Sequence, residues 1–174
     1  AITDNEHPRY RVRCDDWNQS NPKGYAAWFE SRMKIRLDER RSEIALAINK
    51  SVEEVPNYKV KTRLQRVVQI LKRHRDMLYQ DDGEHKPISI IITALAACVY
   101  QNEASLDLAL ERIIFGIKSQ IYVKNGQPYI ANPVNPLENF ADKWAEEPIK
   151  EKEFYRWLDQ LQKDYQALLQ SSDV

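Results

Sequence analysis

Glycine is scarce in this sequence, with 4 in 174 residues, or about 2% against a usual share of roughly 7%. A chain of many tight turns needs more glycine, so an all-β sandwich is disfavoured. No run of 18 apolar residues is present, which predicts no membrane-spanning segment. Residues 1–8 also lack the apolar core of a signal peptide.

The two cysteines, Cys14 and Cys98, do not have the spacing of a metal site. Cys98 lies in an apolar run, so a buried, reduced thiol is predicted there. Reduced thiols and the missing signal peptide together predict a cytoplasmic protein.

Net charge is also absent, because 26 basic residues balance 26 acidic ones, and this excludes a histone-like protein or a polybasic tail. The charges are nevertheless unevenly distributed. Residues 59–75 hold seven Lys and Arg and no acid, whereas residues 137–174 hold nine acids and five bases. A local basic face therefore remains possible on a neutral molecule.

Several catalytic patterns are missing. The sequence has no glycine-rich phosphate loop, no His-Glu-x-x-His and no Asp-x-Asp pair. The histidines lack metal-ligand spacing, and His74 is predicted to be a packed, hydrogen-bonded side chain. We therefore predict neither catalytic nor metal-ligating residues in this sequence.

The chain is long enough for one domain, and 43% of its residues are hydrophobic, enough for a core. Residues 1–20 are predicted to be an extended lead-in, residues 21–170 a helical domain, and residues 171–174 a tail. Apolar spacing and turn residues predict helices over residues 22–37, 42–50, 58–80, 88–100, 104–118, 137–146 and 149–170. The first half of 88–100, taken alone, also fits a buried strand.

Asn125-Gly126 separates two short apolar runs and predicts a β-hairpin. Five residues lie between the runs, so we expect a hairpin looser than one with a two-residue turn. The sequence as a whole predicts a mainly α fold, a bundle of six to seven helices with one small β-hairpin.

The predicted helix over residues 58–80 has one apolar face and a second face that carries Gln65, Gln69, Lys72 and Asp76. Lys72 lies beside the apolar face, where it would be partly screened from water and could hold a phosphate as a point charge. The alternative is an ordinary surface lysine whose stem covers apolar groups.

Ser89 follows Lys86-Pro87-Ile88 and opens an apolar helix. Free amides and the positive end of a helix dipole favour an anion at such a position. The alternative is that Ser89 only caps its own helix. If Lys72 lies on the preceding antiparallel helix, the two side chains would form a two-point phosphate clamp.

The segment 130–144 contains two Asn-Pro pairs, which favour an extended, kinked backbone. Asn139 is expected near the start of the following helix. By itself this segment is interpreted as a structural connector, and its spacing names no ligand.

Four of these stretches, in this order, resemble the C-terminal half of bacterial CD-NTases. They are residues 21–29 (NPKGYAAWF), 61–76 (KTRLQRVVQILKRHRD), 87–97 (PISIIITALAA) and 132–144 (NPVNPLENFADKW). These SMODS-type nucleotidyltransferases are related to oligoadenylate synthetase and cyclic GMP-AMP synthase. The resemblance extends from about residue 15 to 158 and implies a fold similar to the oligoadenylate synthetase C-terminal domain.

The resemblance implies a role in making cyclic di- or trinucleotide messengers from NTPs in anti-phage defence. The family's metal-binding acids and Gly-Ser motif would lie in a catalytic half outside this sequence. Mg²⁺ and NTP are therefore expected for the full-length protein, and this chain is expected to bind no Mg²⁺ through its own acids and to be inactive alone.

By motif, Lys72 and Ser89 would contact the donor triphosphate. Gln65 and Gln69 would reach the base or the acceptor nucleotide. Asn139 matches an Asn-after-Pro motif of oligoadenylate synthetase, which implies either a ligand role or a structural role. Expected partners are nucleoside triphosphates, the catalytic half, and a HORMA-type regulator or an effector.

The residues leave one alternative function open, a non-catalytic binding module. The basic segment 59–75 could hold nucleic acid through its phosphates, which would make binding steeply salt-dependent. It could equally dock a protein partner.

Overall fold

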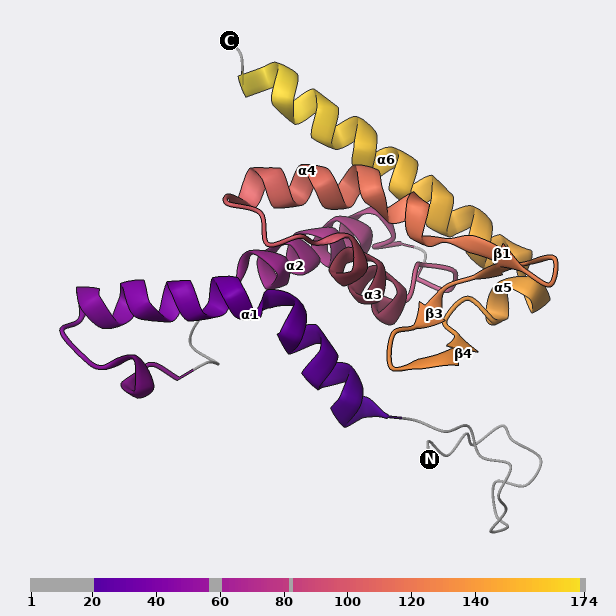
Figure 1. Cartoon of the computed structure of the whole chain (residues 1–174). Coiled ribbons are helices and arrows are strands. Elements are labelled where there is room, and N and C mark those ends of the chain that lie inside the picture. Colours follow the sequence, from indigo (N-terminus) through magenta and orange to yellow (C-terminus); the bar gives the residue numbers. More distant parts are fainter. Residues whose placement is uncertain (1–20, 57–60, 82, 173–174) are drawn as a thin grey trace.

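The computed structural model describes residues 21–56, 61–81 and 83–172, so the predicted lead-in, Cys14 and the end of the predicted tail lie outside the described residues. The described part has six α-helices and two separate two-stranded antiparallel sheets, which confirms the mainly α prediction (Figure 1). The helices are α1 (Pro22–Ala47), α2 (Arg63–Leu78), α3 (Ser89–Val99), α4 (Leu106–Gly116), α5 (Lys143–Glu146) and α6 (Pro148–Ser172). The strands are β1 (Tyr122–Lys124), β2 (Gln127–Tyr129), β3 (Ala131–Asn132) and β4 (Asn135–Asn139), and the 3-10 segments are η1 (Val52–Glu54) and η3 (Ile117–Gln120).

The core forms around α3, a helix that is apolar on nearly every side. It packs against α2, α4 and η3, and α6 crosses over α4 and α2 (Figure 1). Trp157 and Phe154 of α6 are fully buried against this centre. The strand alternative for the first half of 88–100 is therefore wrong. Cys98 is a free but exposed cysteine near the end of α3, so the predicted burial of its thiol is also wrong.

The N-terminal region forms one helix of 26 residues, not the two helices that the sequence predicted. Asn21 caps it as expected, since Asn21 Oδ1 accepts a hydrogen bond from Gly24 N at 2.9 Å. Residues 38–41, between the two predicted helices, are helical as well. The second half of α1 projects away from the main core (Figure 1) and has a small apolar cluster of its own, in which Ala45 packs with Val55. There Arg36 pairs with Glu39 one turn along the helix at 2.7 Å.

The β1–β2 hairpin is tighter than predicted. Lys124 pairs with Gln127, which leaves only Asn125 and Gly126 in the turn. Their φ angles of 53° and 76° are those of a two-residue type I′ turn, whose twist matches that of the strands. The predicted looser hairpin is therefore wrong.

A second sheet, β3–β4, and the turn after it replace the first six residues of the helix predicted over residues 137–146. The residue before a proline avoids helical φ and ψ, and Asn135 stands before Pro136. The extended backbone is held by Tyr129, whose hydroxyl donates to Pro136 O at 2.8 Å, and by Phe140 N, which donates to Ile130 O at 2.8 Å. Only the short α5 remains helical. In contrast, the last predicted helix is confirmed as α6, which continues to Ser172, two residues into the predicted tail.

Candidate functional site: the α2–α3 corner

The end of α2 and the start of α3 meet at a charged corner that consists of Lys72, Arg75, Asp76, Lys86 and Ser89. We call this set the α2–α3 corner. Arg75 Nη1 joins the two helices by donating to Pro87 O and to Ser89 Oγ, each at 2.9 Å. The Arg75 guanidinium thus binds two residues that follow it by 12 and 14 positions in the sequence.

Arg75 is buried, with 6% of its surface exposed. Its Nε and Nη2 donate to Asp76 Oδ1 at 3.0 and 2.8 Å. Lys86 Nζ lies 3.5 Å from the same carboxylate oxygen. The hydrogen bond from Arg75 is the main cause that lowers the pKa of Asp76, and the charges of Arg75 and Lys86 lower it further.

No functional role is predicted for Arg75 from the sequence, although a signal is present. Leu64, Leu71 and Arg75 follow one another at helical spacing on the apolar stripe of α2, and all three are buried. A charged residue at a stripe position must have partners, because an unpaired buried charge is costly.

Lys72 lies one turn before Arg75 on α2 and is partly buried. Burial is the main cause that lowers its pKa, the positive charge of Arg75 lowers it further, and Asp76 opposes the shift. No hydrogen bond or ion pair of Lys72 is found with any residue in the described part of the chain. Lys72 and Ser89 are thus both neighbours of Arg75.

Ser89 is the first residue of α3, and the N-cap is Ile88, which makes no capping hydrogen bond through its side chain. The alternative in which Ser89 caps its own helix is therefore not what is observed. Ser89 Oγ instead accepts from Arg75, and Ser89 O accepts from Thr93 Oγ1 at 2.8 Å. Its exposed hydroxyl and the free amides of the first turn of α3 are suited to an anion.

Gln65 and Gln69, the two other candidates on α2, have different surroundings. Gln65 completes a capping box at the start of α2, where its Oε1 accepts from Thr62 N at 2.9 Å and its N donates to Thr62 Oγ1 at 3.3 Å. Gln69 is exposed and lines a groove with Ile70 and Arg73 on the outer face of α2.

Asn139 lies at the end of β4, and its side-chain hydrogen bonds involve no residue of the α2–α3 corner. Its Oδ1 accepts from Ile130 N at 2.8 Å and from Ala141 N at 3.0 Å, and its Nδ2 donates to Pro128 O at 3.0 Å. These bonds join β2, the link between β2 and β3, and the turn before α5, so the structure gives this side chain a structural role.

A hollow of about 630 Å³ lies between the start of α3 and β4. Ile88 and Ile90, the neighbours of Ser89, form one side, and β4 with the turn after it forms the other. Its volume lies in the range of small-molecule sites, about 300–1,000 Å³. The residues of the α2–α3 corner are not among those that line it.

His74, next to Arg75, is hydrogen-bonded as the sequence predicted. Its Nε2 lies 2.9 Å from Asp164 Oδ2 on α6. This contact joins α2 to α6, and it is the main reason that the pKa of Asp164 is lowered.

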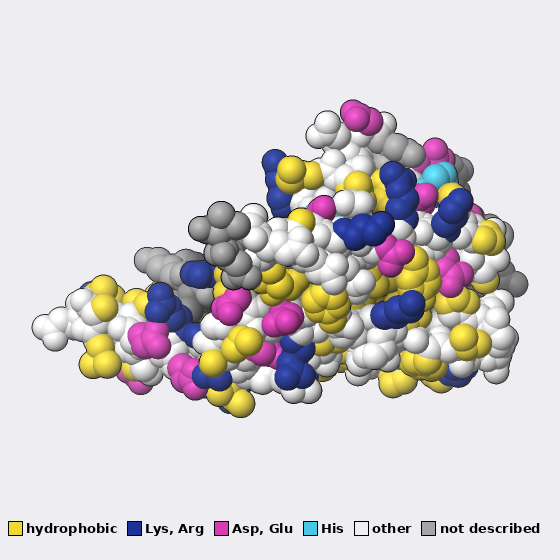
Figure 2. Space-filling model, turned by 90° about the horizontal axis from the view of Figure 1, so that it is seen from above, with side chains coloured by type: hydrophobic (Ala, Val, Ile, Leu, Met, Phe, Trp, Pro, Cys, Tyr) yellow, Lys and Arg dark blue, Asp and Glu magenta, His cyan; other side chains and the backbone are white. Residues whose placement is uncertain are grey.

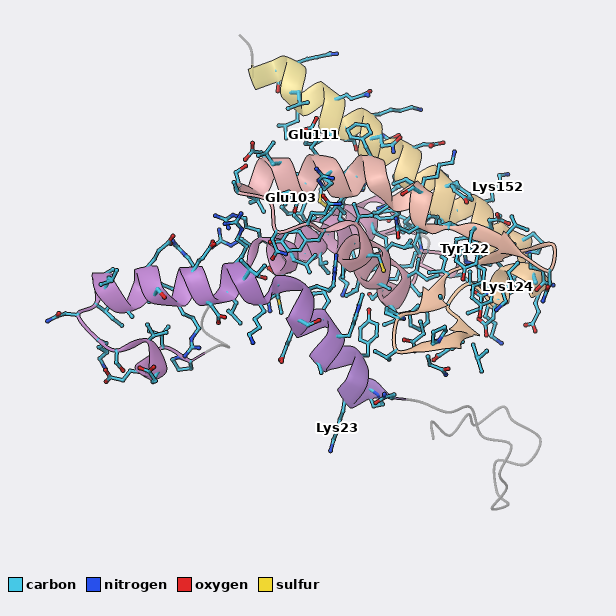
Figure 3. All side chains as sticks on the ribbon, in the orientation of Figure 1. Lys23, Glu103, Glu111, Tyr122, Lys124 and Lys152 are labelled. Carbon is cyan, nitrogen blue, oxygen red and sulfur yellow. The ribbon has the colours of Figure 1, made fainter. Side chains whose placement is uncertain are left out.

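The acids and histidines within residues 21–56, 61–81 and 83–172 form no group of three or more that could hold a metal ion. Glu111 lies on α4 and Glu103 lies shortly before it (Figure 3). The Glu103 carboxylate forms an ion pair with Arg112 at 2.8 Å. None of the helices in the same ranges is long and apolar enough to cross a membrane.

Taken together, the fold and the α2–α3 corner define a mainly helical domain with a candidate anion site. No protein-family model matches the chain. The solved structure of the Bradyrhizobium diazoefficiens CD-NTase CdnG, determined in complex with GTP, has the same fold, with a TM-score of 0.63 and 22% identity. That match covers 86% of this chain and 48% of CdnG.

The chain is also 34% identical over 163 residues to the c-di-GMP synthase of Roseivirga ehrenbergii. The match covers 91% of this chain and 42% of the synthase, so the chain spans less than half the length of that relative. The chain is thus homologous to part of that c-di-GMP synthase, and it has the fold of part of a CD-NTase. The resemblance to the C-terminal helical half of CD-NTases is confirmed.

Proposed function

We propose that this chain is the helical lobe of a nucleotidyltransferase that makes cyclic di- or trinucleotide messengers from NTPs in anti-phage defence. In this proposal the α2–α3 corner contacts the donor triphosphate through Lys72 and Ser89. The observation that carries it is a partly buried lysine without a partner in the described part, beside a hydroxyl at the start of a helix.

The charge balance of the corner supports this assignment. Lys72, Arg75 and Lys86 contribute three positive charges and Asp76 one negative charge, which leaves an excess of two positive charges. Lys72 is partly desolvated, so an anion placed beside it gains more than it would beside a lysine in open water. The free amides at the start of α3 add hydrogen-bond donors and a favourable dipole.

Phosphoryl transfer of this kind needs clustered carboxylates that hold paired Mg²⁺ ions. The described residues do not fit a Mg²⁺ site, because their acids form no such cluster. The role proposed for this chain is therefore to bind and orient the triphosphate. The metal ions and the catalytic acids would belong to another part of the protein.

The two relatives support the substrate class. CdnG was solved with GTP bound, and the synthase from Roseivirga ehrenbergii is named for a cyclic dinucleotide. A nucleoside triphosphate is accordingly the proposed ligand. Gln65 and Gln69 remain predicted contacts to the base or the acceptor nucleotide, and Asn139 remains a predicted ligand with the structural role described above.

The direct test is titration of ATP or GTP with Mg²⁺ into the full-length protein and into Lys72→Ala and Ser89→Ala. Each variant should bind the triphosphate about tenfold more weakly, as expected for the loss of one hydrogen bond to a charged group. Lys34→Ala, which removes an exposed lysine of α1, should bind like the wild type and controls for net charge. Unchanged affinity in both corner variants would remove the corner from the site.

A protein-docking role is the second candidate, and the groove on the outer face of α2 favours it. The groove measures about 580 Å³ and has an apolar floor of Ile70, Met77 and Leu106 between Arg66 and Arg73. Nucleic acid is a poorer fit, because its phosphates leave apolar side chains uncovered, and Figure 2 shows acidic and basic side chains interleaved over one face. If the groove binds a partner protein, Met77→Asp should weaken that complex and leave triphosphate affinity unchanged.

A further inference from the structure

We infer that Arg75 is a positioning residue for the triphosphate. Its buried guanidinium orients the Ser89 hydroxyl toward the ligand and holds the first turn of α3 in place. The inference rests on the proposed function, because it concerns how the same corner binds its ligand. Arg75 itself is not expected to touch the nucleotide.

All three nitrogens of the Arg75 guanidinium are engaged within the protein. Nη1 donates to Pro87 O and Ser89 Oγ, and Nε and Nη2 donate to Asp76. A buried arginine is stable only when its donors are satisfied in this way. The side chain is therefore held in one orientation and has little surface left for a ligand.

The chemistry of the Arg75–Ser89 hydrogen bond decides which way the serine hydroxyl points. A guanidinium can only donate, so Ser89 Oγ must accept in this contact. The hydroxyl has one hydrogen of its own, and no acceptor for it is found in the described part of the chain. That hydrogen is available to donate to a phosphate oxygen. Arg75 thus leaves Ser89 as a donor toward the exposed side of the corner.

The contact with Pro87 positions the backbone as well. Pro87 is buried, and its carbonyl is tied to Arg75 two residues before α3 begins. The path of the chain into α3, and with it the direction of the first free amides, is set by this bond. The same guanidinium therefore aligns both the hydroxyl and the amides that we assign to the triphosphate.

Asp76 holds the other end of the guanidinium and offsets its charge. The attraction of the corner for an anion then depends on Lys72 and Lys86, and Arg75 acts through geometry. Lysine is a poor substitute at position 75, because a single ammonium cannot reproduce the planar fork that reaches three acceptors.

A double-mutant cycle on the full-length protein tests this arrangement, with GTP and Mg²⁺ as the probe. Arg75→Lys and Ser89→Ala should each weaken GTP binding about tenfold. The Arg75→Lys/Ser89→Ala double variant should be no more than about threefold weaker than the weaker-binding single variant, because both changes remove one shared interaction. Fully additive losses would overturn the inference. Arg73→Lys, a change of the same type on the outer face of α2, is the matched control and should bind GTP normally.

Steady-state kinetics separate positioning from a general loss of structure. Arg75→Lys should raise KM for the triphosphate about tenfold and leave kcat at saturation within about threefold, since it weakens binding without removing a reacting group. A thermal melt of each variant shows whether it is folded. A normal KM in folded Arg75→Lys would contradict the inference.

A second pair of variants avoids the buried position altogether. Asp76→Asn and Asp76→Ala remove the same charge, but only Asn keeps an acceptor for Arg75. The affinity of Asp76→Ala for GTP should therefore be at least about threefold lower than that of Asp76→Asn, in line with one lost hydrogen bond. Equal affinities, or tighter binding by Asp76→Ala, would show that Asp76 acts through its charge alone and would overturn the inference.

Failure of the inference and failure of the proposed function give different results. If Lys72→Ala and Ser89→Ala both bind GTP like the wild type, the corner is not the triphosphate site. If these two variants lose affinity while Arg75→Lys does not, the corner remains the site and only the positioning role is wrong.

Discussion

Arg32 of α1 caps the end of α3 by donating from Nη2 to the carbonyl of Tyr100 at 2.6 Å, across 68 positions of sequence. Its Nε donates to Ala97 O at 2.8 Å. The last carbonyls of a helix have no partner within that helix. An arginine from a distant helix supplies one here, which fixes α1 to the central helix of the core.

Removal of this cap should destabilise the domain. Arg32→Ala leaves the carbonyls of Ala97 and Tyr100 without these donors, and the free energy of unfolding should fall by about 1–3 kcal/mol. Arg40→Ala, which removes an exposed arginine paired with Glu43 on the same helix, should cost no more than about 1 kcal/mol. Urea unfolding of the three proteins measures both values. Equal losses of unfolding free energy in the two variants would show that the hydrogen bonds of Arg32 stabilise the domain no more than an exposed ion pair does.

The contact between α4 and α3 should be sensitive to a single methyl group. A Cβ at Gly116 would lie 2.6 Å from Val99 Cγ1, so Gly116→Ala should destabilise the domain by about 1–3 kcal/mol through overpacking. The loss should be smaller when Gly116→Ala is measured in a Val99→Ala background, because the shorter side chain opens space. Gly83→Ala is the control, since a Cβ there meets nothing within 4 Å. Thermal melting of the variants tests the prediction.

Loss of the Asn139 side chain should destabilise the domain. Asn139→Ala leaves Ile130 N and Ala141 N without their acceptor, and the free energy of unfolding should fall by about 1–3 kcal/mol. Asn135→Ala, four residues earlier on β4, is the matched control and should cost less. A stable Asn139→Ala variant that binds ATP more weakly would instead favour the ligand role suggested by the sequence motif.

The lowered pKa of Lys72 gives triphosphate binding a defined dependence on pH. The charged ammonium attracts the anion, so affinity should be highest below the pKa of Lys72 and should fall as pH rises through it. Burial and Arg75 place that fall at a lower pH than for an ordinary lysine. ATP titrations at constant ionic strength between about pH 8 and 10 test this, because phosphates with a pKa near 6 are already ionised there.

Lys72→Arg is the control for this pH dependence. Arginine stays charged throughout the range, so the variant should lose less affinity than the wild type as pH rises. An identical pH profile in both proteins would assign the dependence to another group.

Local chemistry explains which parts of the fold were predictable from the sequence. The apolar spacing of α2 and α6, the Asn21-Pro22 start of α1 and the hairpin at Asn125-Gly126 all depend on neighbouring residues. The errors have other causes. The segment 135–139 is a strand because it pairs with β3, and α1 continues through residues 38–41 as one helix that projects away from the main core.

The candidate site divides in the same way. Helix spacing and a helix terminus indicated Lys72 and Ser89 as candidates for an anion site, and that role stays a prediction. Arg75 was missed, since its partners lie 12 and 14 residues away and only folding brings them together. The structural bonds of Asn139 were likewise hidden, because the acceptor Pro128 O and the donor Ile130 N lie on segments that meet only in the folded chain.

The sequence by itself determined the helical class, the central apolar helix, most helix ends and the resemblance to CD-NTases, because these depend on residue type and short-range spacing. Tertiary structure alone decided the unbroken α1, the second sheet, the exposure of Cys98 and the orientation of the Ser89 hydroxyl. The physical reason is that a hydrogen bond or a buried surface needs a partner, and residue type with short-range spacing does not say which segment supplies it.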